Sequence, residues 1–129
     1  MRILLDTHAL LWWLAGDPHL SEVAKATIGY ETNQVFVSAA SAWEVATKHR
    51  LGKLPEAGPL AVDFGREMKS QGFGELPISW GHAQVAGALP GHHRDPFDRM
   101  LIAQAREEKL ALVSNEEVFD SYDGVTRIW

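Results

Sequence analysis

The chain is organised around the sequence HHRDPFDRMLIAQA at residues 92–105. Asp95 stands where a helix N-cap is expected and Pro96 where the first helical residue is expected, and the apolar residues that follow recur at helical spacing. We therefore predict that a helix begins here. Asp98 falls in its first turn, where free backbone N–H groups and the positive end of the helix dipole favour a carboxylate. Asp-x-x-Asp is also a capping arrangement, so this segment alone leaves open whether Asp98 has any further role.

The composition limits the class of protein. With 129 residues and 46% hydrophobic side chains, we expect a single domain, residues 1–129, with a full hydrophobic core. The formal net charge of −5 means that a polyanionic substrate would be held by local basic residues or by metal ions. The absence of cysteine excludes disulfides and thiol catalysis and agrees with a reducing compartment. No apolar run is long enough for a membrane span, and Asp6 interrupts the N-terminal apolar stretch, so we expect a soluble, cytoplasmic protein without a signal peptide.

Strand and helix patterns alternate along the chain. Short apolar runs predict strands at residues 2–5, 35–37, 75–78, 111–113 and 125–129. Pro77 indicates that the third of these is a sheet edge or a connector. Helical patterns lie between the strands, at residues 7–15, from 18 or 22 to 30, 38–50, 60–71, 80–89 and from 96 onward, with a loop at 54–59. Such alternation predicts an α/β fold, a three-layer α/β/α sandwich with a central parallel sheet.

Acidic residues stand at or near the carboxyl ends of the predicted strands or in the first turn of a helix. In an open parallel sheet, these ends border the ligand crevice, so we expect the carboxylates to gather there. The set comprises Asp6, Glu44, Asp95, Asp98 and Glu116.

Several of these residues also have a purely structural interpretation. Asp6 fits a turn aspartate that accepts local N–H bonds. Ser41 and Glu44 match a capping box, and Glu116 with Glu117 fits the start of a short helix. The segments taken one at a time do not decide between these interpretations.

Like charges that share one crevice repel one another and raise one another's pKa, so the arrangement is costly unless a cation neutralises it. Mg²⁺ and Mn²⁺ prefer oxygen ligands and are bound by few carboxylates and several waters, with a substrate phosphate completing the shell. Such a site can activate a water and stabilise the leaving oxygen of a phosphodiester. The acidic set therefore predicts a Mg²⁺ or Mn²⁺ site.

Basic and histidine residues give weaker signals. Lys48 begins a basic cluster with His49, Arg50 and Lys53, which fits either a solvated helix end or lysines that face a phosphate. Adjacent histidines rarely converge on one ion, so we interpret His92 and His93 as loop residues.

Four segments, in their order along the chain, resemble the motifs of the PIN domain. They read LLDTHALLW at residues 4–12, SAWEV at 41–45, DPFDRMLIAQA at 95–105 and LVSNE at 112–116. The resemblance spans essentially the whole chain and is closest to the VapC-like toxins of bacterial type II toxin–antitoxin systems. It implies a Mg²⁺- or Mn²⁺-dependent ribonuclease that acts on RNA, forms a homodimer and is inhibited by a separately encoded antitoxin.

The resemblance also implies roles for single residues. Asp6, Glu44 and Asp98 match the acidic catalytic site, and Asp95 matches an extra aspartate of the sub-group that carries Asp-Pro-Phe-Asp-Arg. Glu116 departs from the pattern, because many relatives have aspartate there. Glutamate is one methylene longer, so we expect Glu116 to act weakly or through water. The expected metal ligands are Asp6, Glu44, Asp95, Asp98 and Glu116, and the expected substrate-binding residues are Thr7, Lys48, Arg99, Ser114 and Asn115.

Other classes fit the residues around Asp6 less well. A phosphatase of the haloacid dehalogenase type needs a second aspartate two residues later, where this chain has His8. A receiver-type signalling domain needs an acidic pair after the first strand, which Asp6-Thr7 does not provide. The alternative that remains is a catalytically silent PIN-like fold that acts only through protein or RNA binding.

The tryptophans indicate a protein partner. The chain has five, and Trp12 and Trp13 are neighbours on one short predicted helix, so they cannot all face a small core. Exposed aromatic side chains are common in interfaces. Together with the resemblance to the VapC-like toxins, this leads us to expect a homodimer and an antitoxin whose apolar helix covers this surface and whose basic side chain enters the acidic crevice.

Overall fold

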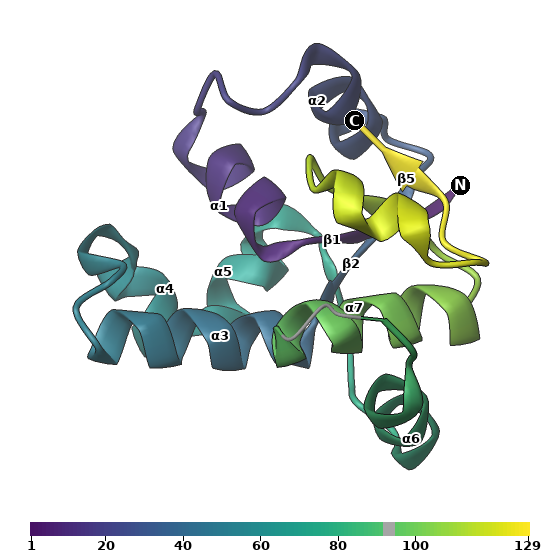
Figure 1. Ribbon diagram of the computed structural model, residues 1–129. Helices are drawn as coiled ribbons and strands as arrows, with labels where there is room; N and C mark the ends of the chain where they lie inside the picture. Colours follow the sequence, from purple (N-terminus) through teal and green to yellow (C-terminus); the bar gives the residue numbers. More distant parts are fainter. Residues whose placement is uncertain (92–94) are drawn as a thin grey trace.

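The computed structural model describes residues 1–91 and 95–129, so the interpretation of His92 and His93 lies outside the described residues. Its centre is a five-stranded sheet in the order β3-β2-β1-β4-β5, in which all neighbouring strands are parallel. The strands are β1 (Arg2–Leu5), β2 (Gln34–Ser38), β3 (Gly74–Leu76), β4 (Ala111–Val113) and β5 (Arg127–Ile128). Helices cover both faces of this sheet (Figure 1). The predicted α/β/α sandwich with a central parallel sheet is therefore confirmed.

Several helices begin where capping residues predict. They are α1 (Thr7–Ala15), α2 (Glu22–Gly29), α3 (Ala39–Arg50), α4 (Gly58–Val62), α5 (Phe64–Gln71), α6 (Trp80–Ala88) and α7 (Pro96–Glu107), with 3-10 turns η1 (Pro55–Ala57) and η2 (Glu117–Ser121). Asp95 is the N-cap of α7 and Pro96 its first residue, as predicted. Of the two starts that the sequence allowed for α2, the structure uses the one capped by Ser21.

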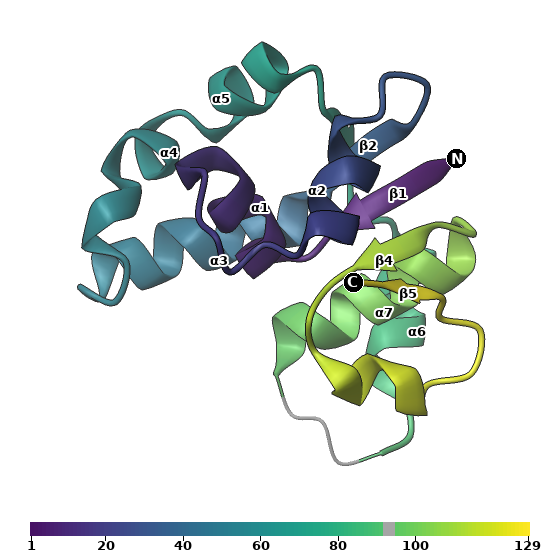
Figure 2. The same cartoon turned by 90° about the horizontal axis from the view of Figure 1, so that it is seen from above.

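Alternation along β1 divides the core between the two faces of the sheet. Ile3 and Leu5 pack with apolar residues of α1, α2 and the segment from η1 to α5, whereas Leu4 packs with those of α6 and α7. Seen from above in Figure 2, α1 and α2 lie in front of the sheet, and α6 and α7 lie behind β4 and β5. The side chains of Ile3, Leu4 and Leu5 are fully buried, which is why this part of β1 is a continuous apolar run.

The structure corrects the predicted boundaries in the middle of the chain. The single helix predicted at 60–71 is wrong, because Asp63 leaves the helical conformation (φ −145°, ψ 79°) and its carboxylate accepts the Arg66 N–H. Asp63 therefore ends α4 and caps α5. The segment predicted as a loop at 54–59 contains η1 and the start of α4. At the sheet edge, β3 ends before Pro77, which has no N–H to donate.

The strand order fixes where a ligand crevice can form. From β1 the chain proceeds to β2 and β3 on one side, then crosses over to β4 and β5 on the other. The neighbours β1 and β4 thus flank the point where the direction of winding reverses. In open α/β sheets, ligands bind at the carboxyl ends of strands at such a point. Asp6 and Ser114, which follow β1 and β4, stand there.

Within residues 1–91 and 95–129, no helix combines the length and apolar character that crossing a membrane requires.

Leu4 offers a test of the core. We expect Leu4→Ala to lower the free energy of unfolding by about 2–5 kcal/mol, because Leu4 is fully buried against α7 and the substitution leaves a cavity. Urea denaturation followed by circular dichroism measures the loss. Val23→Ala, at an exposed position of α2, is the control and should cost less than about 0.5 kcal/mol. Similar losses in both variants would contradict this description of the core.

Candidate active site

Asp6 joins the end of the central strand to α1. Its backbone N–H donates to the Val113 carbonyl of β4 at 3.0 Å. Its carboxylate Oδ1 accepts the Ala9 N–H at 2.7 Å, so Asp6 is the N-cap of α1. The Ser114 side chain lies close enough to this carboxylate to lower its pKa. The local N–H bond that the sequence allowed for Asp6 is therefore present. The residue is only 3% exposed, so its carboxylate lies almost entirely out of solvent.

Burial raises the pKa of Asp6 from 3.8 to about 6. The Ser114 side chain, the hydrogen bond from Ala9 and the charge of His8 act in the opposite direction, while the charge of Asp98 adds to the effect of burial. The carboxylates of Asp6 and Asp98 are therefore close enough to repel each other, although they come from opposite ends of the sequence. This repulsion indicates that Asp6 and Asp98, two of the predicted acidic residues, lie near each other in the fold.

Glu44 lies inside α3 rather than at its start. This helix begins at Ala39 and is capped by Ser38, whose Oγ accepts the Ala40 N–H at 2.9 Å. The capping box that the sequence offered for Ser41 and Glu44 is therefore not formed. Glu44 is 4% exposed, so its carboxylate is buried without a capping role.

The two oxygens of the Glu44 carboxylate have different partners. Oε1 lies 2.6 Å from the Thr7 hydroxyl, and Oε2 lies 2.5 Å from Nζ of Lys48. The Thr7 hydroxyl is also 2.9 Å from Oγ of Ser41. A hydroxyl carries one proton and an ionised carboxylate only accepts, so we assign Thr7 as donor to Glu44 and acceptor from Ser41. These contacts tie α1 to α3 at the crevice.

Asp95 and Asp98 reach the crevice from the start of α7. Oδ1 of Asp95 accepts the N–H groups of Phe97 at 2.9 Å and Asp98 at 3.3 Å. Capping is therefore performed by Asp95, which leaves another role open for the Asp98 carboxylate. Burial acts to lower the pKa of Lys48, but its hydrogen bond to Glu44 and the charges of Glu44, Asp95 and Asp98 together raise that pKa above its ordinary value. Three carboxylates thus act on one ammonium group.

The end of β4 contributes polar groups. Ser114 is fully buried beside Asp6, and its Oγ accepts the Glu116 N–H at 3.0 Å. Glu116 joins this region through that backbone contact, while its side chain is exposed and makes no capping bond at the start of η2. Asn115 is also exposed. The structure thus brings Ser114 to Asp6 and leaves the side chains of Asn115 and Glu116 in solvent.

Arg99 has contacts on another side of α7. Its Nε donates to the Ala86 carbonyl at 3.0 Å, and its Nη2 donates to the carbonyls of Leu89 at 2.6 Å and Gly87 at 3.5 Å. These bonds satisfy carbonyl groups at the end of α6 and hold α6 against α7. These contacts give Arg99 a structural role, and its contact with substrate stays a prediction.

Two features of the site were not predicted from the sequence. The ion pair of Glu44 with Lys48 has a signal in their i, i+4 spacing, which places both on one face of a helix. The contact of Ser41 with Thr7 joins two different helices, and no local pattern indicates it.

The carboxylates share one region without converging on one point. Among residues 1–91 and 95–129, no three histidine, cysteine, aspartate or glutamate side chains are placed to hold a metal ion between them. Mg²⁺ is usually bound through one or two carboxylates and keeps several waters. An all-oxygen donor set of this kind fits a largely hydrated divalent ion better than an ion enclosed by the protein.

The raised pKa of Asp6 predicts a pH-dependent effect on stability. Because the folded-state pKa is about 6 and the ordinary value is 3.8, the folded chain holds the proton more tightly than the unfolded chain. The resulting penalty grows as the pH rises from about 4 to 6 and is complete above that range. In EDTA at about pH 7.5, we expect Asp6→Asn to be more stable than the wild type by on the order of 2 kcal/mol, because asparagine keeps the capping acceptor without the charge.

Urea denaturation at about pH 7.5 and pH 4 measures this difference, which should shrink at the lower pH. An equal loss of stability at both pH values would mean that Asp6 serves mainly as a cap.

Comparison with known proteins places this site in a family. The sequence matches the family model described as PIN domain over residues 3–125. One curated relative, Ribonuclease VapC16 of Mycobacterium tuberculosis (strain ATCC 25618 / H37Rv), is 44% identical over 54 residues, which are 42% of this chain and 37% of that protein. The chain therefore matches little more than a third of the length of this relative.

Solved structures share the fold. The crystal structure of VapBC2 from Rickettsia felis, bound to a DNA fragment from their promoter, matches with a TM-score of 0.70 at 15% identity, over 98% of this chain and 97% of that one. DNA-bound VapBC from Salmonella typhimurium matches with a TM-score of 0.69 at 18% identity, over 98% and 96%. At these identities the similarity establishes the fold alone. The family follows from the sequence model, which covers nearly the whole chain: this protein belongs to the PIN domain family.

Proposed function

We propose that residues 1–129 act as a single domain with metal-dependent endoribonuclease activity, and that the chain is the toxin of a type II toxin–antitoxin pair acting in the cytoplasm. The observation that carries this proposal is the gathering of the Asp6, Glu44, Asp95 and Asp98 carboxylates near the carboxyl ends of β1 and β4, where the direction of winding reverses. Membership of the PIN domain family supports it, as do the name Ribonuclease VapC16 of the curated relative and the VapBC complexes among the structural neighbours.

Asp6, Glu44 and Asp98 would hold a Mg²⁺ or Mn²⁺ ion, with Asp95 beside them. The burial of Asp6 and Glu44 supports this role, because two buried carboxylates near a third call for a positive charge. A divalent ion supplies activation of the attacking water and stabilisation of the leaving oxygen of an RNA phosphodiester. Glu116 would contribute weakly, through water, because its side chain points into solvent.

Other residues of the chain would orient the carboxylates and the substrate. Thr7 contacts one oxygen of Glu44, and the Ala9 N–H contacts Oδ1 of Asp6, so both carboxylates have a set direction. Ser114 and Asn115 would contact a phosphate oxygen or an ordered water at the end of β4. Lys48 would supply positive charge to the phosphate backbone, which carries most of the affinity for nucleic acid.

Incubation of the purified protein with total RNA, with and without Mg²⁺ or Mn²⁺, tests this function. We expect cleavage that requires the metal and stops in EDTA, and mapping of the cut ends then identifies the RNA and the site. Intact RNA under every metal condition would favour the alternative, a catalytically silent PIN-like fold that acts through protein or RNA binding.

Substitution of single carboxylates should separate their roles. We expect Asp6→Asn and Asp98→Asn each to lower the cleavage rate on the order of 100-fold or more, because each removes charge that positions the ion. Glu116→Gln should lower the rate far less, and Glu116→Asp should be tolerated. Glu31→Gln, on an exposed turn before β2, is the matched control. Rates across a Mn²⁺ titration decide the question, and a loss for Glu116→Gln as deep as that for Asp98→Asn would indicate direct ligation by Glu116.

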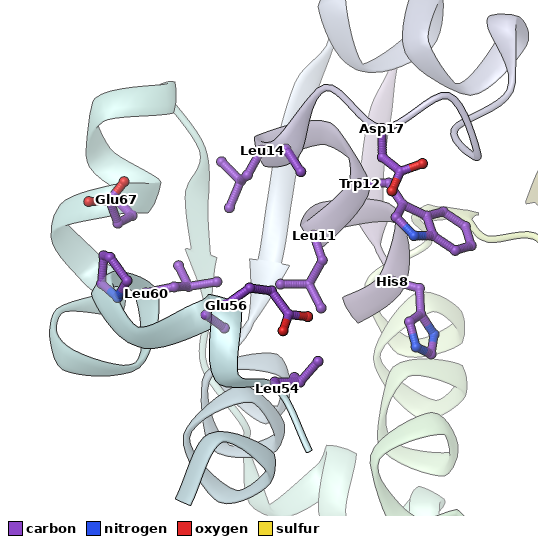
Figure 3. Close-up of a pocket in the computed structure, with 12 residues that line it drawn as sticks. His8, Leu11, Trp12, Leu14, Asp17, Leu54, Glu56, Leu60 and Glu67 are labelled. Carbon is purple, nitrogen blue, oxygen red and sulfur yellow. The ribbon is translucent and has the colours of Figure 1, made fainter. Parts of the chain in front are cut away.

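A largely apolar groove, which Asp17, Glu56 and Glu67 also line, would receive the antitoxin. Its volume is about 450 Å³, and it lies between α1 and the segment from Leu54 to α5. Figure 3 shows Leu11 and Leu14 of α1 on one side of it and Leu54 and Leu60 on the other. His8, two residues after Asp6, also lines the groove, so an apolar helix seated here could direct a basic side chain to the carboxylates. We propose the cognate antitoxin as its occupant.

Exposed tryptophans would serve the homodimer. Trp43 is 62% exposed and packs edge-on against Phe97 at 5.0 Å between ring centroids, and Trp80 is 92% exposed. Both lie outside the groove that we assign to the antitoxin. Light scattering would distinguish the proposed dimer from a monomer.

Filling the groove should block the antitoxin without unfolding the protein. Ala15 is exposed at the end of α1 and lines the groove, so Ala15→Arg places a large charged side chain there. We expect this variant to lose antitoxin binding in a co-purification assay while it still cleaves RNA. Ala26→Arg, at an exposed position of α2 outside the groove, is the matched control. Retained binding by Ala15→Arg would assign the antitoxin to another surface.

A further inference from the structure

The Lys48 ammonium contacts one carboxylate of the site and is acted on by the charges of two others. Its Nζ is 2.5 Å from Oε2 of Glu44, whose side chain is 5% exposed. The charges of Asp95 and Asp98 act on the same ammonium group. The other Glu44 oxygen is taken by the Thr7 hydroxyl. Lys48 therefore occupies the Glu44 oxygen that Thr7 does not contact, and a divalent ion at that oxygen would have to share it with the ammonium.

We infer that Lys48 is an internal counter-ion, which neutralises Glu44 in the metal-free protein and competes with the divalent ion for that carboxylate. The inference rests on the proposed function, because it concerns the same acidic site. Lys48 acts here as a positioning residue, since it decides whether Glu44 is available as a ligand.

Electrostatics explains why the two cations exclude each other. A lysine ammonium and a divalent ion on one carboxylate group would lie a few ångströms apart, and like charges repel at that distance. Conversely, Glu44 is buried, and a buried carboxylate without any cation is strongly destabilising. One cation or the other is therefore favoured at Glu44, and the arrangement with Lys48 is the one that needs no metal.

The side chain of Lys48 is suited to such an exchange. It is 32% exposed, so a path to solvent exists, and lysine is a point charge on a flexible four-carbon stem. Thr7 would keep hold of Oε1 while Oε2 changes its partner, so the carboxylate would keep its direction. The displaced ammonium would then be available to a substrate phosphate. When the ion binds Glu44 it thus releases Lys48, and the released ammonium can bind the RNA backbone.

Mn²⁺ binding to the full-length protein, measured by calorimetry without RNA at constant ionic strength, tests the inference. We expect Lys48→Met, which removes the ammonium and keeps an unbranched stem, to bind Mn²⁺ about tenfold more tightly than the wild type. Lys53→Met removes the same charge from an exposed position just beyond α3 and should bind like the wild type. If Lys48→Met folds poorly, Lys48→Gln, whose amide can still donate to Glu44, should bind more tightly than the wild type by a smaller factor.

A double-mutant cycle separates competition for Glu44 from a general effect of charge. With Glu44→Gln as the background, Lys48→Met should no longer change Mn²⁺ affinity, because there is no carboxylate left to compete for. Affinity that is unchanged or weaker in Lys48→Met overturns the inference, and so does an equal gain in Lys53→Met or in the Glu44→Gln background. If neither the wild type nor any of the variants binds Mn²⁺, the metal site of the proposed function fails as well. Metal-dependent RNA cleavage without the Lys48 effect leaves that function intact.

Discussion

Carboxylates at one edge of the sheet repel one another, and the neighbouring helices supply the groups that reduce this repulsion. Each carboxylate is placed where a positive or hydrogen-bonding group reduces the cost. Asp6 accepts an N–H at the start of α1, Asp98 lies in the first turn of α7, and Glu44 is held by Thr7 and Lys48. Helix N-termini favour negative charge because their N–H groups and dipole point toward it. The pKa of Asp6 is nevertheless raised, mainly by burial and to a smaller degree by the charge of Asp98, so these contacts do not remove the cost of the charge completely.

The sheet topology creates this repulsion. Because β1 lies between β2 and β4, the segments that follow all three strands emerge at the same edge. Parallel strands buried on both faces hold this edge rigidly, since side chains of β1 pack against helices above and below it. The same rigidity keeps the carboxylates from moving apart in the absence of a cation. A residue such as Lys48, on a flexible stem, can respond where the backbone cannot.

Stability and function therefore oppose each other at the crevice. A protein selected for stability alone would place neutral side chains at Asp6 and Glu44, where burial penalises charge. Such local conflicts with folding rules are expected at functional sites, and the rest of the structure compensates for them. Here compensation comes from a core on both faces of the sheet and from polar contacts such as that of Arg99 with the end of α6.

Local chemistry in the sequence determined the elements with strong end signals. Asp95 and Pro96 fix the start of α7, and Gly16, with φ 63°, ends α1. The apolar periodicity of residues 60–71 was misleading, because it runs through Asp63, whose carboxylate competes with the helical backbone. Capping and chain reversal depend on residues within about four positions of one another, so a sequence displays them directly.

Only the tertiary structure decided which acidic residues meet and what each one contacts. Glu44 and Glu116 both follow strands of the sheet, yet Glu44 is buried against Thr7 and Lys48 while the Glu116 side chain is exposed. Arg99 lies next to Asp98 in the sequence, but its guanidinium bonds to the end of α6. The physical reason is that charge interactions and side-chain hydrogen bonds depend on distances of a few ångströms between residues far apart in the chain. Those distances are set by the order of the strands and by the packing of α1, α3 and α7, which no local pattern of residues encodes.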